Sequence, residues 1–170
     1  MTGLGADLLT EFEAFCDRLS ADELQNTVAT DAGVSPDWLA ARLRTSLAEA
    51  RHTLRFVAPE LRAGQRILEI GAGLGLTSGF LARVEHDVTS IEPGGEGFED
   101  YRRTNPAIRR ALGVVHPHHE MDVEEVEAAR LGGRFDLVFS NNVLEHVAQP
   151  HLALERLDAV LAPGGVMIHN

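Results

Sequence analysis

Three glycines at alternate positions, Gly71, Gly73 and Gly75, follow directly on the apolar segment Ile67–Ile70. Glycine allows the backbone to turn tightly and to approach a ligand closely, because it has no Cβ. A helical pattern resumes after the loop, and the first turn of such a helix directs free N–H groups and the positive end of its dipole toward an anion. The pattern therefore indicates a loop that binds the anionic part of a ligand.

The spacing of the glycines separates two cofactors that use such a loop. A dinucleotide, which binds through its pyrophosphate, requires glycine at relative positions one, three and six. Here the third glycine stands at position five, Leu76 occupies position six, and Glu69 lies two residues before the first glycine. This E-x-G-x-G-x-G pattern resembles motif I of class I methyltransferases, whose cofactor S-adenosylmethionine would bind through its carboxylate.

A second carboxylate, Glu92, ends the next expected strand, seventeen residues after Gly75. Ligands of open α/β sheets bind at the carboxyl ends of the strands, where a carboxylate can accept hydrogen bonds from both hydroxyls of a ribose. The alternative is a solvated glutamate at the end of a strand. Glu92 alone does not exclude a nicotinamide cofactor, so an NAD-dependent oxidoreductase stays as a remote alternative.

Two later segments extend the resemblance toward the end of the chain. Phe135–Val147 is similar to the fourth strand and following turn of small-molecule methyltransferases, and Leu161–Gly165 is similar to the turn that leads into their fifth strand. With the glycine loop and Glu92 they make four matching segments in the family's order, within residues 65–170. The chain therefore resembles class I methyltransferases of the small-molecule type.

This resemblance implies a set of contacts to S-adenosylmethionine. The glycine loop would line the methionine end of the cofactor, with Glu69 near its amino group and Glu92 on the ribose. Adenine would be held just after the third strand by Asp122 and Val123, with Glu120–Met121 as the alternative match, and Asn141 would lie beside the sulfonium. The residues expected to bind the cofactor are Glu69, Gly71, Ala72, Gly73, Gly75, Glu92, Pro93, Asp122, Val123 and Asn141.

Catalysis of methyl transfer can come largely from positioning the two reactants, although an oxygen or nitrogen acceptor can also need a base. His146, just past the fourth expected strand, is the candidate base. The alternative is a packing or capping histidine in a short helix. The run His116–Glu120 contains three histidines, but neighbours on an extended segment point opposite ways, so we expect no metal site.

The elements that must position these residues alternate between strand and helix from residue 65 onward. The expected strands are Arg66–Ile70, Asp87–Glu92, Ala111–His116, Phe135–Ser140 and Val166–Asn170. The expected helices between them are Gly75–Val84, Gly97–Thr104, Val123–Leu131 and Pro150–Leu161. Such alternation predicts an α/β, Rossmann-like doubly wound parallel sheet with five strands, over residues 63–170.

Residues 1–62 are expected to form a helical segment that precedes this domain. Ser20–Glu23 has the form of a capping box that would begin a short helix, and Ser35 before Pro36 is a good N-cap for a longer one. An apolar stripe then runs from Leu39 to Val57. Two readings stay open: the helices pack onto the main domain as a support, or they form a lid over the ligand site.

Composition excludes several classes of function. The formal net charge of −11 disfavours binding to a phosphate backbone, and Ser140–Val143 stands where DNA amino-methyltransferases carry an Asn/Asp-Pro-Pro-aromatic motif. The chain has no lysine, which excludes a Walker A loop and a Schiff-base enzyme. A lone cysteine, Cys16, is expected to be a buried thiol of a cytoplasmic protein, and no apolar run is long enough to span a membrane.

The last expected strand, Val166–Asn170, would leave a bare sheet edge, which tends to pair with another strand. The expectation is therefore either a fragment whose later strands are missing, or a second copy or partner chain that covers this edge. Two functions follow. The first is methyl transfer from S-adenosylmethionine to a small-molecule acceptor, and the second is a non-catalytic module that binds the cofactor alone or with a partner.

Overall fold

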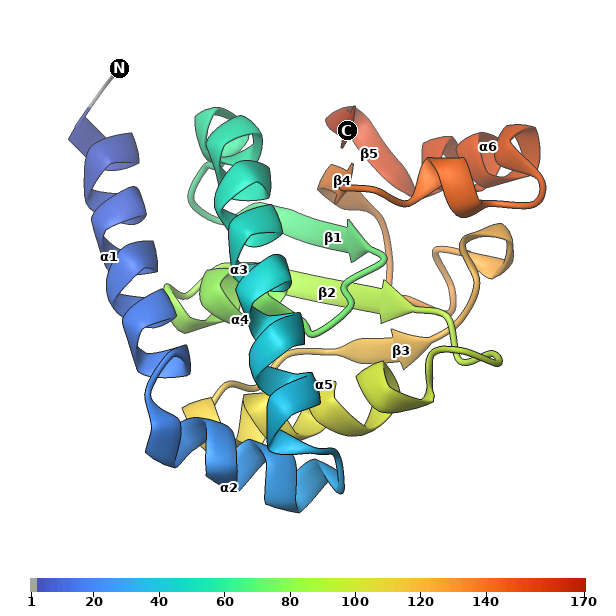
Figure 1. Ribbon diagram of the computed structural model, residues 1–170. Coiled ribbons are helices and arrows are strands. Elements are labelled where there is room, and N and C mark those ends of the chain that lie inside the picture. The colour runs from blue at the N-terminus through green and yellow to red at the C-terminus, as the bar shows by residue number, and fades with distance from the viewer. Residues whose placement is uncertain (1–2) are drawn as a thin grey trace.

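The computed structural model describes residues 3–170 and contains one sheet of parallel strands in the order β3-β2-β1-β4-β5 (Figure 1). Its strands are β1 (Arg66–Ile70), β2 (Asp87–Glu92), β3 (His118–Glu120), β4 (Phe135–Ser140) and β5 (Leu161–His169). After β3 the chain returns to the centre of the sheet, where β4 pairs with β1 on the side opposite β2. The predicted Rossmann-like fold is confirmed, and the carboxyl ends of β1 and β4 form its topological switch point.

Six α-helices accompany the described strands. They are α1 (Gly3–Leu19), α2 (Asp22–Ala32), α3 (Pro36–Val57), α4 (Leu76–Arg83), α5 (Glu99–Leu112) and α6 (Pro150–Val160). Single 3₁₀ turns follow at η1 (Ala58–Glu60), η2 (Val123–Glu125) and η3 (Leu144–His146). Within residues 3–170, no helix has the length and apolar character needed to cross a membrane.

Alternating side chains of the strands pack into separate apolar cores on the two faces of the sheet. Ile67 and Leu137 lie on one face, in a core shared with apolar residues of α1 to α5. Leu68 and Val138 lie on the other face, packed with α6 and with residues of the segment 121–134. The sheet is therefore covered on both faces, which leaves the loops at the strand ends as the places where a ligand can approach the sheet.

The third strand was predicted at Ala111–His116, and this is wrong. Helix α5 continues through Pro106 to Leu112 and ends at Gly113, whose φ of +66° allows its N–H to bond the carbonyls of Arg109 and Arg110. A proline inside a helix normally ends or kinks it, yet this helix runs eight residues beyond its predicted end at Thr104. Buried residues beyond the proline outweigh this cost; they are Ala107, Ile108 and Leu112.

Two further expected elements differ from the structure. The helix expected at Val123–Leu131 is reduced to the single turn η2, followed by irregular turns. Strand β5 begins five residues earlier than Val166, at Leu161, and its pairing with β4 is irregular between Phe135 and Leu137. Gly164, with a φ of +80°, lies in this irregular part, so the glycines expected to form a turn instead form a bulge within the strand.

The N-terminal helices pack against the sheet domain through one apolar core. Ser35 caps α3 as predicted, since its Oγ accepts a hydrogen bond from the Trp38 N–H at 3.1 Å. The expected capping box is wrong, because the Ser20 Oγ donates to the Cys16 carbonyl instead and Ala21 is the N-cap of α2. Cys16 is buried, as expected. The division of the chain after residue 62 stays a prediction.

Candidate functional site

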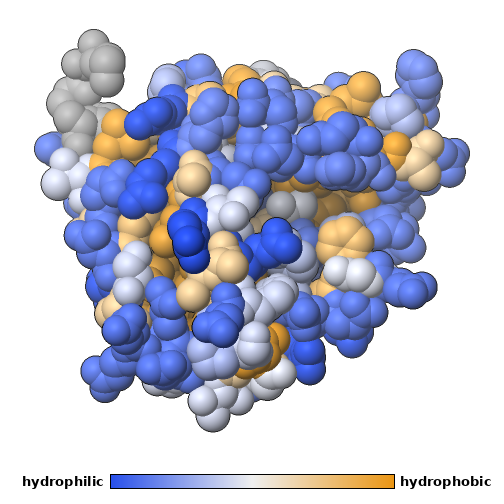
Figure 2. Space-filling view, in the orientation of Figure 1, coloured by the Kyte–Doolittle hydropathy of each residue, from blue (hydrophilic) through white to orange (hydrophobic). Residues whose placement is uncertain are grey.

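A cavity of about 670 Å³ opens at the carboxyl ends of the strands, around the switch point between β1 and β4. Figure 2 shows apolar side chains at the bottom of a hollow to the right of its centre, where Figure 1 places these strand ends. Among the residues that the sequence singled out, those that line the cavity are Glu69, Gly71, Ala72, Gly73, Glu92, Pro93, Asp122, Val123, Asn141 and His146. Gly75 is not in its wall; it caps the N-terminus of α4.

The glycine loop is fixed by main-chain hydrogen bonds to β2 and to itself. The N–H groups of Gly71 and Ala72 both donate to the Ile91 carbonyl at 3.0 Å, and the Gly75 N–H donates to the Ala72 carbonyl at 2.7 Å. Gly71, Gly73 and Gly75 have φ of +69°, +53° and +71°, a region that other residues rarely adopt. The three glycines are thus required by the backbone itself.

Two of these glycines also leave room for neighbouring side chains. A Cβ at Gly71 would collide with Cγ2 of Val143, which follows β4, and a Cβ at Gly75 would lie 2.6 Å from Nδ2 of Asn105 on α5. Contacts this short are not tolerated without a shift of one partner. The loop after β1 is therefore packed between the loop after β4 and helix α5.

Glu69 lies at the back of the cavity with only 6% of its surface exposed. Its Oε2 accepts a hydrogen bond from the Ser78 N–H in the first turn of α4, at 3.0 Å. Burial disfavours the charged form and raises the pKa of this carboxyl to about 7, although the Ser78 bond opposes the shift. The cavity thus contains a carboxyl group that titrates near neutral pH.

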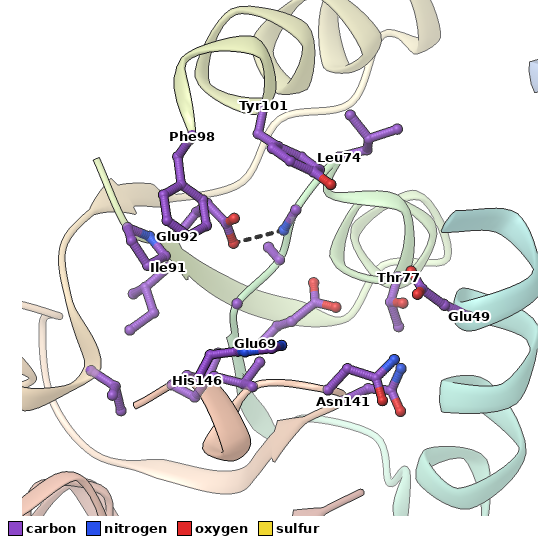
Figure 3. A pocket seen from close by; sticks show the side chains of 18 of the residues that line it. Glu49, Glu69, Leu74, Thr77, Ile91, Glu92, Phe98, Tyr101, Asn141 and His146 are labelled. Atoms are coloured by element: carbon purple, nitrogen blue, oxygen red, sulfur yellow. Dashed lines mark hydrogen bonds between the residues drawn. The ribbon is translucent and has the colours of Figure 1, made fainter. Parts of the chain in front are cut away.

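Glu92, at the end of β2, closes the cavity from the other side of the loop. Its Oε2 accepts a hydrogen bond from the Gly73 N–H at 2.8 Å (dashed in Figure 3). The side chain is 7% exposed, and burial raises its pKa while the Gly73 bond lowers it. The carboxylate and the glycine loop are therefore already in contact across the strand ends.

The segment after β3 forms a further part of the wall. The Met121 N–H donates to the Glu92 carbonyl at 3.0 Å, which ties this segment to the end of β2. Met121 and Val123 are buried, whereas Asp122 is exposed at the cavity. Both Asp122–Val123 and Met121 of the alternative match reach the cavity, but Glu120 does not line it.

The loop after β4 contributes Asn141 and His146. The Asn141 Oδ1 accepts a hydrogen bond from the Asn170 Nδ2 at 2.9 Å, and the same Nδ2 lies 3.1 Å from Nε2 of His52 on α3. His146 ends the turn η3 and is exposed, and its side chain makes no hydrogen bond or ion pair within the described chain. Asn141 is thus held in place, while the His146 imidazole is not.

Sequence reasoning missed the part of the wall that comes from α3. Arg42, Ser46, Glu49 and Thr53 follow one another at spacings of four, three and four residues, which places them on one face of the helix. Figure 3 shows Glu49 pointing from this helix into the cavity. These polar residues alternate with the apolar stripe of the same helix, and that pattern in the sequence could have predicted a polar face toward a ligand site.

Aromatic residues near the start of α5 were also missed. Phe98 and Tyr101 line the cavity, with ring centroids 6.4 Å apart, and Trp38 of α3 meets Tyr101 edge-on at 6.3 Å. The guanidinium of Arg42 lies 5.2 Å from the centroid of the Tyr101 ring, within the range of a cation–π contact. These residues join α3 to α5 beside the glycine loop.

The expected histidine run lies away from this cavity. Ser90 Oγ is 3.1 Å from Nε2 of His116 and 2.8 Å from Nδ1 of His118. Burial, with the nearby charge of Arg109, lowers the pKa of His116 to about 3 and that of His118 to about 4. Both imidazoles are therefore neutral at ordinary pH, and they form polar contacts from β3 and the segment before it to Ser90 of β2.

Comparison with known proteins adds to this geometry. Residues 40–170 match the family model described as a methyltransferase domain. An uncharacterized protein of Mycobacterium tuberculosis is 34% identical over 120 residues, which cover 69% of this chain and 40% of that protein. A ubiquinone biosynthesis O-methyltransferase of Psychrobacter arcticus is 30% identical over 132 residues, which cover 78% of this chain and 49% of that protein.

A solved structure resembles the chain at a similar level of identity. The N-terminal domain of EvdMO1, crystallised with SAH bound, has a TM-score of 0.54 and 30% identity, covering 67% of this chain and 46% of that one. The chain spans less than half the length of the curated relatives it matches.

Proposed function

Because this chain belongs to the methyltransferase-domain family, we propose that it binds S-adenosylmethionine in the cavity and transfers the methyl group to a small-molecule acceptor. The observation that carries the proposal is the contact between the glycine loop and Glu92, 2.8 Å long, at the switch point of a doubly wound sheet. A loop and a carboxylate in this relation suit a ligand with an anionic group and a ribose.

The residues present fit such a cofactor. S-adenosylmethionine supplies a methyl group on a sulfonium that is already activated for displacement. The cavity of about 670 Å³ lies within the usual range for ligand sites. Three of the carboxylates in its wall, Glu69, Glu92 and Asp122, suit a ligand that carries an amino group, ribose hydroxyls and an adenine amino group.

Each part of the cofactor has a proposed partner in the cavity wall. Glu69 pairs with the amino group of the methionine moiety, beside the loop Gly71–Gly75, and Glu92 with Pro93 holds the ribose. Asp122 accepts from the adenine amino group, while the Val123 N–H reaches a ring nitrogen. Support comes from the fact that these side chains, apart from Gly75 itself, line one cavity.

Asn141 and His146 are proposed for the reacting end. Asn141 lies beside the sulfonium, where its side chain is held by the Asn170 amide. His146 is the candidate general base, because it lines the cavity, is exposed and is not engaged by another residue of the described chain. A base matters only for an acceptor that must lose a proton.

A small-molecule acceptor is favoured over nucleic acid by the net charge of −11. The proposed acceptor side is the polar stripe of α3, since it lines the cavity and none of its residues takes part in the assigned cofactor contacts. In this proposal α3 covers the ligand site, as in the prediction that the N-terminal helices form a lid. A cytoplasmic location is proposed from the single buried cysteine.

The second candidate is a module that binds the cofactor without turnover. It is favoured by the free edge of β5 in the described sheet and by the fact that the chain spans less than half of its curated relatives. In this case a partner chain, a second copy or further sequence would complete the acceptor site next to β5.

Calorimetric titration of the chain with S-adenosylhomocysteine and with NAD tests the proposal. We expect S-adenosylhomocysteine to bind and NAD not to bind. Glu92→Ala should lower the affinity for S-adenosylhomocysteine by about tenfold or more, because charge-assisted hydrogen bonds to the ribose are lost. Glu96→Ala, a change in the exposed loop after β2, is the matched control and should leave the affinity unchanged.

Binding of NAD without S-adenosylhomocysteine would overturn the proposal. Transfer of a labelled methyl group from S-adenosylmethionine into a metabolite extract then separates the enzyme from the module. Incorporation supports the enzyme. Binding of the cofactor without incorporation, in assays of this chain and of a longer version of it, supports the module.

A further inference from the structure

Asn105, a buried residue of α5, contacts the glycine loop although it takes no part in the assigned cofactor contacts. Its Nδ2 donates a hydrogen bond to the Gly73 carbonyl at 3.1 Å, and the residue is 1% exposed. The same Nδ2 occupies the space beside Gly75, where a Cβ would lie only 2.6 Å away. Asn105 is absent from the described wall of the cavity, so any effect on a ligand must pass through the loop.

The hydrogen bond to Gly73 determines the orientation of the next N–H group. In a planar trans peptide the carbonyl of one residue and the N–H of the following residue point in opposite directions. Because Asn105 draws the Gly73 carbonyl toward α5, the Leu74 N–H is directed away from that helix. Leu74 lies in the wall of the cavity.

The Leu74 N–H has no other role within residues 3–170. The neighbouring donors of the loop are engaged: the Gly71 and Ala72 N–H groups bond Ile91, and the Gly73 N–H bonds Glu92. In contrast, the Leu74 N–H donates to no acceptor in the described chain. A main-chain donor that is free beside a ligand cavity is suited to an anionic group.

We propose that Asn105 is a positioning residue that holds the 73–74 peptide so that the Leu74 N–H donates to the carboxylate of the bound cofactor. The inference rests on the proposed function, since it takes the ligand to be S-adenosylmethionine or its product. It extends the site to a residue 32 positions from Gly73, whose side chain contacts the loop from outside the cavity.

The test compares two ligands that differ at the proposed contact. S-adenosylhomocysteine carries the amino-acid carboxylate, whereas 5′-methylthioadenosine has the adenosine and thioether without it. Asn105→Leu keeps the approximate shape of the side chain and removes its donor. We expect the dissociation constant for S-adenosylhomocysteine to rise about tenfold, as for the loss of a hydrogen bond to a charged group, while that for 5′-methylthioadenosine changes less than about twofold.

Thr104→Val is the matched control, because Thr104 is the buried neighbour of Asn105 on α5 and its Oγ1 has no hydrogen-bond partner in the described chain. It should change neither affinity. If Asn105→Leu does not fold, Asn105→Ser and Asn105→Ala take its place. Because serine keeps a hydrogen-bond donor, the preference of Asn105→Ser for S-adenosylhomocysteine over 5′-methylthioadenosine should lie between that of the wild type and that of Asn105→Ala.

Equal loss of both ligands in the Asn105 variants, or no loss of either, overturns the inference while leaving the proposed function intact. A wild-type chain that binds neither ligand overturns the proposed function itself. The two failures are therefore distinguishable within one set of titrations.

Discussion

The loop after β1 and the loop after β4 meet at the switch point, but they are built differently. In the first, buried hydrogen bonds to Ile91, Glu92 and Asn105 hold the backbone, and positive φ values require glycine. In the second, Asn141 is tied to Asn170, whereas His146 is exposed and unpaired. The donors and the carboxylate that would bind the cofactor are held by hydrogen bonds within the protein, whereas the imidazole that would act on the acceptor is not.

This difference suggests that affinity for the cofactor and turnover depend on separate regions. Preorganised donors lose little on binding, so changes in the first loop should act on cofactor affinity and on stability together. Exposed side chains of the second loop contribute little to folding, so changes there should act on turnover alone. Three substitutions test this separation.

The largest effect is expected for Gly71→Ala. A side chain at this φ of +69° costs about 1–2 kcal/mol, and the new Cβ must also displace Val143. We expect a loss of about 3 kcal/mol in the free energy of unfolding, measured by urea denaturation, and a fall in affinity for S-adenosylhomocysteine of about 100-fold.

The control for this prediction is Gly71→Ala combined with Val143→Ala. Removing the Val143 methyl groups should recover the part of the lost unfolding free energy that comes from the steric clash. The part that comes from the positive φ at position 71 should stay lost. If the double variant is as unstable as the sum of the two single variants, the close packing of the two loops is not what excludes a side chain at position 71.

A smaller effect is expected for Glu69→Gln, and it depends on pH. A pKa raised from 4.5 to about 7 means that the folded protein holds a proton which the unfolded chain has released. Stability therefore falls as the pH rises through this window and stays low above it. The amide keeps an oxygen for the Ser78 N–H without the buried charge, so the variant should gain up to about 3 kcal/mol at pH 8.5.

Below pH 4.5 the carboxyl is protonated in both states, and the gain should disappear. Urea denaturation at pH 4, 6 and 8.5 measures the trend. Glu124→Gln, which removes a carboxylate from another part of the cavity wall, is the control and should not reproduce this gain at pH 8.5. A gain of equal size at every pH would contradict the burial of a titrating carboxyl at position 69.

The smallest effect on folding and on cofactor binding is expected for His146→Ala. Exposed substitutions usually change the free energy of unfolding by less than about 0.5 kcal/mol, and the affinity for S-adenosylhomocysteine should stay within about twofold of the wild type. Methyl transfer, measured with a labelled cofactor, should fall about 100-fold if the imidazole removes a proton. Unchanged turnover would remove His146 from the chemistry and leave positioning as the source of rate.

The same comparison explains what the sequence could predict. The loop after β1 depends on local signals, namely alternate glycines after an apolar strand, and Glu69 and Glu92 stand at the strand ends where the pattern placed them. The fold follows from the alternation of elements. These features are encoded within short windows, so they can be inferred without knowing what lies across the molecule.

The features that sequence analysis missed depend on contacts between distant segments. Helix α5 continues past Pro106 because residues beyond it are buried against the N-terminal helices and the sheet. The segment after Val123 lacks the expected helix, and its buried residues pack in the core of the second face without one. The contact from Asn105 to Gly73 joins residues 32 positions apart, so no pattern within a short stretch of sequence can predict it.

The central claim is that the glycine loop and Glu92 form the cofactor site, and amide NMR of the wild-type chain during titration with S-adenosylhomocysteine tests it most directly. We predict that the largest shifts fall on the amides of Gly71, Gly73 and Leu74 and that Glu92→Ala reduces them. Shifts that cluster instead along β5, or that leave the glycine loop unaffected at saturation, would contradict the account.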